Sequence, residues 1–197
     1  GANDEENVAG SFPQGVLLNE RSINGIASEP VLESAEYELA ASWFGWRTRP
    51  SPESQILLRD GISLFAVARA AEARGGEAAR HDQIARLVAR YDSARLRAAD
   101  GALLKLSADS SREQKTTSAY RAALFLSALE DLAGRESFDR ALRRFWTAMA
   151  GNDIAADELR SALEADTGRD LAAVFRTWLN NPGIPDDFRA RYASSRE

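Results

Sequence analysis

Apolar residues recur at helical spacing along most of the chain, beginning near residue 28. Ser28 is a typical residue to cap a helix, and Gly45 is a typical residue to end one. Between them one broad face is apolar, made of Val31, Leu32, Ala35, Leu39, Ala40, Trp43 and Phe44. This pattern predicts a first helix that buries this face.

The same periodicity continues to about residue 180. The run Ser51-Pro52-Glu53 is a second start signal, and its apolar stripe reaches Gly75-Gly76. Gly61 interrupts this helix and therefore requires a packing reason. A third segment, about 77–98, is predicted to bury Tyr91 among aliphatic residues. Further helices are predicted at about 114–133, 136–150, 154–166 and 170–180, the last ended by Pro182-Gly183-Ile184-Pro185.

Four arginines lie on the outer side of the third segment: Arg86, Arg90, Arg95 and Arg97. Such a row can be a patch for a polyanion or a solvated helix face. The acidic balance of the chain favours the solvated face, since the formal net charge is -5. The same balance disfavours nucleic acid as the main partner.

The first thirty residues lack helical periodicity. Residues 15–18, Gly-Val-Leu-Leu, predict one short strand. We expect a disordered tail at 1–9, one helical domain over 10–190 that is a fragment of a longer protein, and a second tail at 191–197. The predicted fold class is mainly α with a short irregular or β segment at the N-terminal end. No apolar run has the roughly 20 residues that a transmembrane helix requires.

Composition excludes several kinds of chemistry. The chain has 197 residues, no cysteine and one histidine, His81. Cysteine nucleophiles, disulfides and zinc sites built from two imidazoles are therefore impossible within this sequence. A Ser-His-Asp relay would have to use His81 alone.

The informative stretch is residues 36–45, Glu-Tyr-Glu-Leu-Ala-Ala-Ser-Trp-Phe-Gly. It resembles the H-E-L-A-H-x-W-F-G segment of the gluzincin zinc aminopeptidases of the aminopeptidase N type. In that family two histidines one helical turn apart bind zinc, and the glutamate between them activates the zinc-bound water. Here Tyr37 and Ala41 stand at the two histidine positions, while Glu38 keeps the position of the general base.

The resemblance continues at the expected spacing further along the chain. The family's third ligand is a glutamate after 18 intervening residues, and here that position is Asp60. A tyrosine that supports the oxyanion follows about 60 residues later, which corresponds to Tyr120. The Pro-Gly-x-Pro ending also resembles the end of that catalytic domain. The stretch Gly10-Ser11-Phe12-Pro13-Gln14-Gly15 matches the family's G-x-M-E-N segment but lacks its glutamate. The resemblance implies the helical lobe of a thermolysin-like catalytic domain.

The substituted ligands predict loss of the metal. Ala41 offers no donor atom, and a tyrosine must ionise from a pKa of about 10 before it can serve as an anionic ligand. Without zinc, Glu38 would face a water molecule that it can barely activate. We therefore expect no cofactor and a pseudo-peptidase with vestigial residues Tyr37, Glu38, Ala41, Asp60 and Tyr120. We also expect the ring of Tyr37 to take the vacated metal position and to donate a hydrogen bond to Glu38 or Asp60.

Three functions follow as alternatives. The former cleft is kept for packing or for binding a peptide or protein segment, with Tyr37, Glu38, Arg59, Asp60 and Tyr120 as candidate binding residues. A metal-free hydrolase could instead use Glu38 and Asp60 as paired carboxylates, or His81 as a base. A helical interaction module would leave an open groove between the first two helices and the Tyr120 helix. Bacterial relatives of that family occur inside and outside the cytoplasm, so the sequence leaves the compartment unassigned and favours an extracytoplasmic setting over the cytoplasm.

Overall fold

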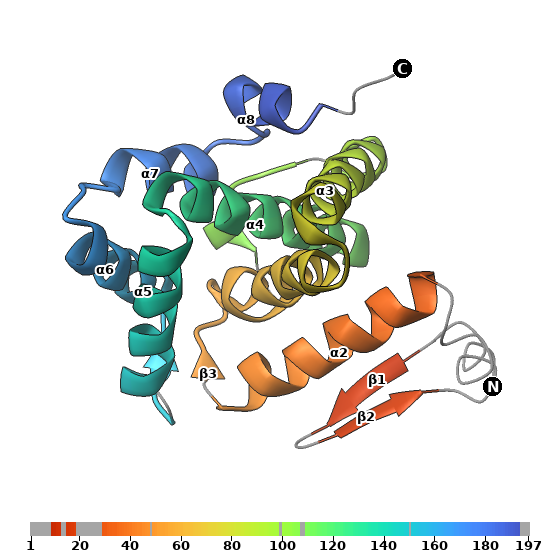
Figure 1. Cartoon of the computed structure of the whole chain (residues 1–197), viewed down its shortest axis with the longest axis horizontal. Helices are drawn as coiled ribbons and strands as arrows, with labels where there is room; N and C mark the ends of the chain where they lie inside the picture. Colours follow the sequence, from red (N-terminus) through yellow and green to blue (C-terminus); the bar gives the residue numbers. More distant parts are fainter. Residues whose placement is uncertain are drawn as a thin grey trace.

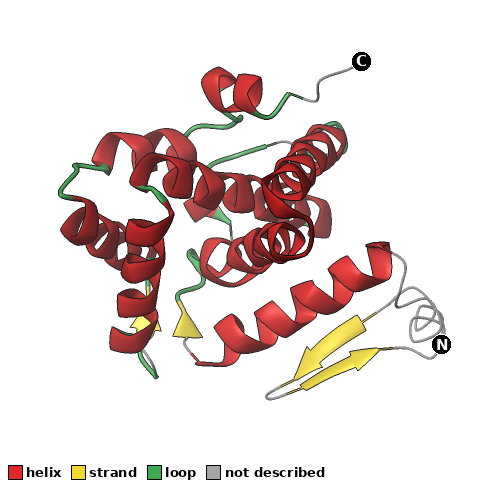
Figure 2. Ribbon diagram, in the orientation of Figure 1, coloured by secondary structure: helices red, strands yellow, loops and turns green. Residues whose placement is uncertain are grey.

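The computed structural model of the chain describes residues 9–12, 15–18, 29–47, 49–98, 100–106, 109–149 and 151–193. These residues form mainly α-helices, with two small two-stranded sheets at the edges of the molecule (Figure 1, Figure 2). The predicted fold class is therefore confirmed. Ser28, predicted to cap the first helix, lies outside the described residues.

The helices are α2 (Glu29–Arg47), the π-helix η1 (Ile56–Gly61), α3 (Ile62–Arg95), the short 3-10 helix η2 (Leu103–Lys105), α4 (Arg112–Ala133), α5 (Arg135–Ala148), α6 (Ala156–Thr167), α7 (Ala172–Asn180) and α8 (Asp186–Arg191). The predicted second and third segments join in α3, where Gly76 has a φ of 74° that kinks the helix. The first helix continues two residues past Gly45, so the predicted end was wrong. Helix α8 was not predicted.

The strands in the described part of the chain are β1 (Ala9–Phe12), β2 (Gly15–Leu18), β3 (Arg49–Pro50) and β4 (Asp153–Ile154). The predicted strand at residues 15–18 is present, and it pairs in antiparallel register with β1, from Ala9 opposite Leu18 to Phe12 opposite Gly15. This hairpin lies beside α2 (Figure 1). Strands β3 and β4 are parallel and connect the end of α2 with the start of α6.

Helix α4 forms the centre of the core. All residues from 121 to 127 are buried, and the helix packs against α3, η1 and α5. A capping box closes its first turn, because the Ser111 hydroxyl accepts from the Gln114 amide and the Gln114 side chain accepts from the Ser111 amide. This rigid helix positions Tyr120 toward the space between α4 and α2.

Helix α2 attaches to α3 largely through ion pairs. Glu33 pairs with Arg90 at 2.7 Å, Glu29 pairs with Arg86 at 2.6 Å, and Glu36 pairs with Arg74. Arg86 and Arg90 are thus partly exposed, as a solvated face requires, but they also pair with α2, which the sequence did not predict. Sequence periodicity reports which side is polar, but not whether another charged helix covers that side.

The predicted buried face of α2 is also wrong in part. Leu39 and Trp43 are 64% and 57% exposed, whereas Ala41 is fully buried. Helix α2 carries apolar residues on more than one side, and its acidic residues decide which side turns toward α3. In the described part of the chain, none of the helices combines the length and apolarity needed to cross a bilayer.

Candidate functional site

A cleft of about 530 Å³ opens between α2, the η1–α3 segment and α4. Four of the five predicted binding residues line it: Tyr37, Glu38, Asp60 and Tyr120. The fifth, Arg59, contacts the cleft residue Asp60 through an ion pair of 3.4 Å. The structure thus brings together residues that are up to 83 positions apart in the sequence.

The local folding of each element explains these positions. Tyr37 and Ala41 are one turn apart on α2, which places them on the same side of the helix. Ala41 is fully buried and does not line the cleft. Asp60 lies in the π-helix η1, next to Gly61. A Cβ atom on Gly61 would lie only 2.5 Å from the Cβ of Ala122, so the glycine allows η1 to approach α4 closely. This is the packing reason that the sequence required.

Tyr37 and Asp60 connect the two walls of the cleft. The Tyr37 hydroxyl donates a hydrogen bond of 3.3 Å to Asp60 Oδ1. Burial raises the pKa of Tyr37 well above its usual range, and the negative charge of Asp60 acts in the same direction. The phenol therefore stays protonated and serves as a donor to the carboxylate.

Asp60 is a carboxylate in a partly dry environment. Burial raises the pKa of Asp60, and the nearby charge of Glu38 adds to this rise. The Arg59 guanidinium and the hydrogen bond from Tyr37 act against it. Glu38 and Tyr120 line the same cleft, and no side-chain hydrogen bond or ion pair joins either of them to another residue in the described ranges. Within the cleft, Glu38 and Asp60 thus have unequal surroundings.

His81 is not placed to act as a base in this cleft. It lies on α3, where its Nε2 is 3.2 Å from the carbonyl oxygen of Arg191 and its ring contacts the ring of Tyr192 at 5.3 Å. It does not line the cleft. The suggestion that His81 serves as the base of a hydrolase in this cleft is therefore not supported.

Several cleft residues were missed by the sequence analysis. Glu33, Gln83, Arg90, Arg112 and Lys115 also line the cavity. Arg90 was assigned to the outer face of its helix, and the other four carried no motif. Spacing gave a signal for Arg112 and Lys115, because they lie with Tyr120 on one side of α4.

Two solved structures resemble this architecture closely in fold. An M1 zinc metallopeptidase from Deinococcus radiodurans superposes with a TM-score of 0.69 and 21% identity over 91% of this chain and 38% of its own. A mutant of that protein bound to the substrate Tyr-Ser-Ala gives a TM-score of 0.70 at 21% identity, with the same coverage of both chains. The chain has the fold of the helical part of an M1 zinc metallopeptidase.

Aminopeptidase A from Legionella pneumophila, in complex with aspartic acid, has the same fold over 90% of this chain and 21% of its own, with a TM-score of 0.63 and 19% identity. No model of a known protein family matches the sequence, and a search of curated proteins finds no match. The chain thus spans less than two-fifths of the length of each of these structures.

The residues of the cleft do not fit the zinc ion that this fold implies. A catalytic zinc site uses three protein ligands drawn from histidine, cysteine and carboxylate side chains. Among the residues that the structure describes, no three such side chains lie together. Glu38 and Asp60 remain, but Ala41 provides no donor and the Tyr37 hydroxyl already donates to Asp60. The raised pKa of Tyr37 further disfavours the phenolate that a metal would need.

Proposed function

We propose that this chain is a non-catalytic, peptidase-like domain that binds a peptide or protein segment in its cleft without zinc. The observation that carries the proposal is the hydrogen bond between Tyr37 and Asp60, two positions that the resemblance assigns to zinc ligands. A hydroxyl that donates to a carboxylate replaces the attraction that a cation would supply. The cleft is thereby stabilised without a metal.

The same geometry argues against hydrolysis. Zinc lowers the pKa of a bound water molecule from 15.7 to about 7, and a carboxylate such as Glu38 can deprotonate only the activated water efficiently. With a buried alanine at one ligand position and a protonated phenol at another, that activation is lost. Tyr120 then has no oxyanion to stabilise.

The open cleft favours binding over a purely structural remnant. A remnant would be filled by the ring of Tyr37 and its neighbours, whereas about 530 Å³ stays open beside that ring. Pockets of this size hold small ligands and short peptides. Similar structures carry such ligands, since the Deinococcus protein is bound to Tyr-Ser-Ala and the Legionella protein to aspartic acid.

Metal content and turnover test this proposal together. The purified chain is incubated with zinc chloride, dialysed and measured by mass spectrometry for bound metal, and its turnover of L-alanine para-nitroanilide is followed. We expect substoichiometric zinc and no turnover above buffer. The matched variant Tyr37→His/Ala41→His/Asp60→Glu is expected to retain more zinc than the natural chain. One zinc ion per natural chain would overturn the proposal.

A metal-free hydrolase is the second candidate, and one observation favours it. Burial and the charge of Glu38 raise the pKa of Asp60, and a carboxyl group with a raised pKa can serve as a general acid beside a second carboxylate. Turnover of peptide reporters that persists in EDTA and disappears in Glu38→Gln would support this candidate. Turnover that Glu38→Gln leaves unchanged would point to a contaminating enzyme.

A further inference from the structure

Helix α2 forms one wall of the cleft, and the two parts of this helix are attached to the molecule in different ways. Among residues 29–40, all of which the structure describes, no apolar side chain is buried. Ala41, by contrast, is fully buried, and Phe44 packs against the main core, with its ring 5.1 Å from the ring of Trp146. Apolar contact therefore anchors the C-terminal part of α2 only.

The part of α2 that lines the cleft lies N-terminal to this anchor. It contributes five residues to the cleft wall: Pro30, Glu33, Ser34, Tyr37 and Glu38. Charged side chains hold this part to α3, in the pairs Glu29 with Arg86, Glu33 with Arg86 and Arg90, and Glu36 with Arg74. The three arginine side chains are 39–42% exposed. Ion pairs that are open to solvent contribute little to stability and are screened by salt.

One hydrogen bond joins this part of α2 to the opposite side of the cleft. The Tyr37 hydroxyl donates to Asp60 Oδ1 at 3.3 Å, which is long for a bond between a hydroxyl and an oxygen. Asp60 belongs to η1, which is fixed by the close contact of Gly61 with Ala122 of α4. The bond therefore connects a weakly attached wall with a firmly attached one.

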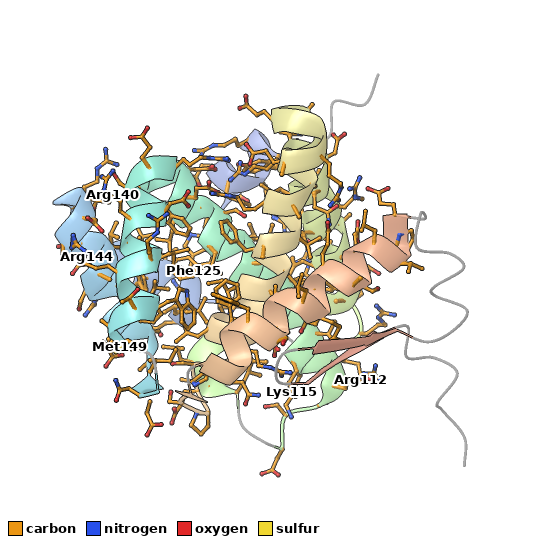
Figure 3. The ribbon with its side chains drawn as sticks, turned by 60° about the horizontal axis from the view of Figure 1, so that its bottom comes forward. Arg112, Lys115, Phe125, Arg140, Arg144 and Met149 are labelled. Atoms are coloured by element: carbon orange, nitrogen blue, oxygen red, sulfur yellow. The ribbon has the colours of Figure 1, made fainter. Side chains whose placement is uncertain are left out.

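The firmly attached wall is built into the core. Residues 121–127 of α4 are all buried, and Phe125 lies in the centre of the molecule (Figure 3). Helix α2 instead lies across the outside of α3, next to the hairpin of β1 and β2 (Figure 1, Figure 3). A segment with few buried apolar contacts and with partly exposed bonds opens at a small free-energy cost, well below that of global unfolding.

We propose that residues 29–40 of α2 are a lid that opens and closes the cleft by turning about the anchored end at Ala41 and Phe44. Opening breaks the glutamate–arginine pairs and the bond from Tyr37 to Asp60, and it moves α2 away from α4. The hairpin beside α2 moves with the lid. This inference rests on the proposed function, because it states how access to the same cleft is controlled.

Hydrogen–deuterium exchange of the full chain without ligand tests the motion. The measured quantity is the protection factor of each amide, which corrects for its intrinsic exchange rate. We expect residues 33–40 to be at least about tenfold less protected than residues 121–127. Raising NaCl from about 0.05 M to about 1 M should lower protection in residues 33–40 several-fold and leave residues 121–127 unchanged. Equal protection of the two segments, or no response to salt, would overturn the lid.

Two variants weaken the closed state at different bonds. Glu33→Gln removes the charge that pairs with Arg86 and Arg90, and it should lower protection in residues 33–40 by up to about fivefold. Tyr37→Phe keeps the ring and removes the bond to Asp60, with an expected loss of about twofold to tenfold. Equal losses in α2 and α4 would show global unfolding and contradict the inference. If Glu33→Gln does not fold, Tyr37→Phe and the salt dependence decide.

The matched control is an ion pair away from the cleft. Asp157→Asn breaks the pair with Arg160 on α6, whose charged atoms are 3.3 Å apart. It should leave the protection of residues 33–40 unchanged. A loss there as large as that of Glu33→Gln would mean that any lost ion pair loosens α2, and the lid would not depend on its own contacts.

Exchange in the presence of a peptide separates the lid from the proposed function. Tri-alanine is added to the natural chain, and its affinity is measured by calorimetry. At about ten times its dissociation constant, a peptide enclosed by the closed lid should raise protection in residues 33–40 about tenfold. Binding that leaves this protection unchanged would overturn the lid and support the proposed function. Absence of binding would overturn the proposed function, while the ligand-free measurements would still decide the lid.

Discussion

The surroundings of Asp60 differ from those of a carboxylate that binds a metal ion. Its side chain is 17% exposed, and its neighbours are the donor Tyr37, the cation Arg59 and the anion Glu38. A metal ion would hold such a carboxylate ionised. Here the effect of burial on the pKa of Asp60 exceeds the opposing effects of Arg59 and Tyr37, so this pKa rises above its ordinary value. Ionised Asp60 is therefore a cost to the folded state.

We expect Asp60→Asn to stabilise the protein at pH 7. The pKa of Asp60 is higher in the folded state than in the unfolded state, so the protein takes up protons when it folds. The contribution of Asp60 to the free energy of unfolding therefore falls as the pH rises from the unfolded pKa, about 3.9, through the folded pKa. Asparagine keeps an oxygen that accepts from Tyr37 and carries no charge. The D60N variant should therefore unfold at higher urea concentration at pH 7, and the difference should close toward pH 4.

An exposed aspartate provides the control for this change. Asp82 has a side chain that is 72% exposed, and Asp82→Asn should shift the urea midpoint little at either pH. The argument about Asp60 fails if D60N is less stable than the natural chain at pH 7. It also fails if the difference between them does not depend on pH.

At the scale of elements, the position of Asp60 depends on the contact between η1 and α4. Gly61 and Ala122 are both buried, and a Cβ on Gly61 would lie 2.5 Å from the Cβ of Ala122. The added atom would also lie 3.1 Å from the carbonyl oxygen of Ile56. Because buried helix backbones cannot separate without opening the core around them, this contact allows no larger residue.

Gly61→Ala is expected to lower the free energy of unfolding by about 1–3 kcal/mol, the usual cost of forcing an extra methyl group into a packed core. Chemical denaturation followed by circular dichroism measures this loss. Ala122→Gly should recover part of it in the G61A/A122G double variant, since it removes the atom that clashes.

The matched control for the packing argument is Gly101→Ala, because a Cβ on Gly101 meets no atom within 4 Å. It should change stability by a few tenths of a kcal/mol at most. Similar losses in G61A and G101A, or no recovery in the double variant, would show that the η1–α4 contact does not limit the site.

How far the sequence predicts the elements depends on what each pattern measures. Periodicity and end signals locate the helices well, and the kink at Gly76 falls at the predicted boundary between two of them. Periodicity does not predict which neighbour a face meets. Leu39 and Trp43 are therefore exposed against expectation, and Arg90 faces α2.

The same limit applies to the site. Motif spacing brings Tyr37, Glu38, Asp60 and Tyr120 to one cleft because it reflects a known helical arrangement. Gln83, Arg112 and Lys115 belong to no motif, and only the three-dimensional packing of α3 and α4 brings them to that cleft. This part of the cleft lining was therefore not predictable from the sequence.

At the scale of the whole molecule, Asp100 joins three distant parts of the chain. Its Oδ2 atom accepts from Arg121 Nη1 of α4 at 2.8 Å and from the Gly183 amide at 2.6 Å, and it also accepts from the Tyr91 hydroxyl of α3. Burial and this hydrogen bond raise the pKa of Tyr91 to about 12, so the phenol remains a donor. The Pro-Gly-x-Pro ending is thereby tied to the core beneath α4.

Asp100→Ala is expected to lower the free energy of unfolding by about 3–5 kcal/mol, because it leaves the fully buried guanidinium of Arg121 without its carboxylate. For a domain of this size the melting temperature should fall by about 10 °C. Asp157→Ala is the matched control, since Asp157 is 82% exposed and pairs with Arg160 one turn away on α6. Such a pair contributes about 0.5 kcal/mol or less. If both variants melt within a degree or two of each other, Asp100 does not hold the C-terminal helices to the core. The packing of those helices against α4 must then depend on apolar contacts, such as those of Phe125 with Phe175 and Trp178.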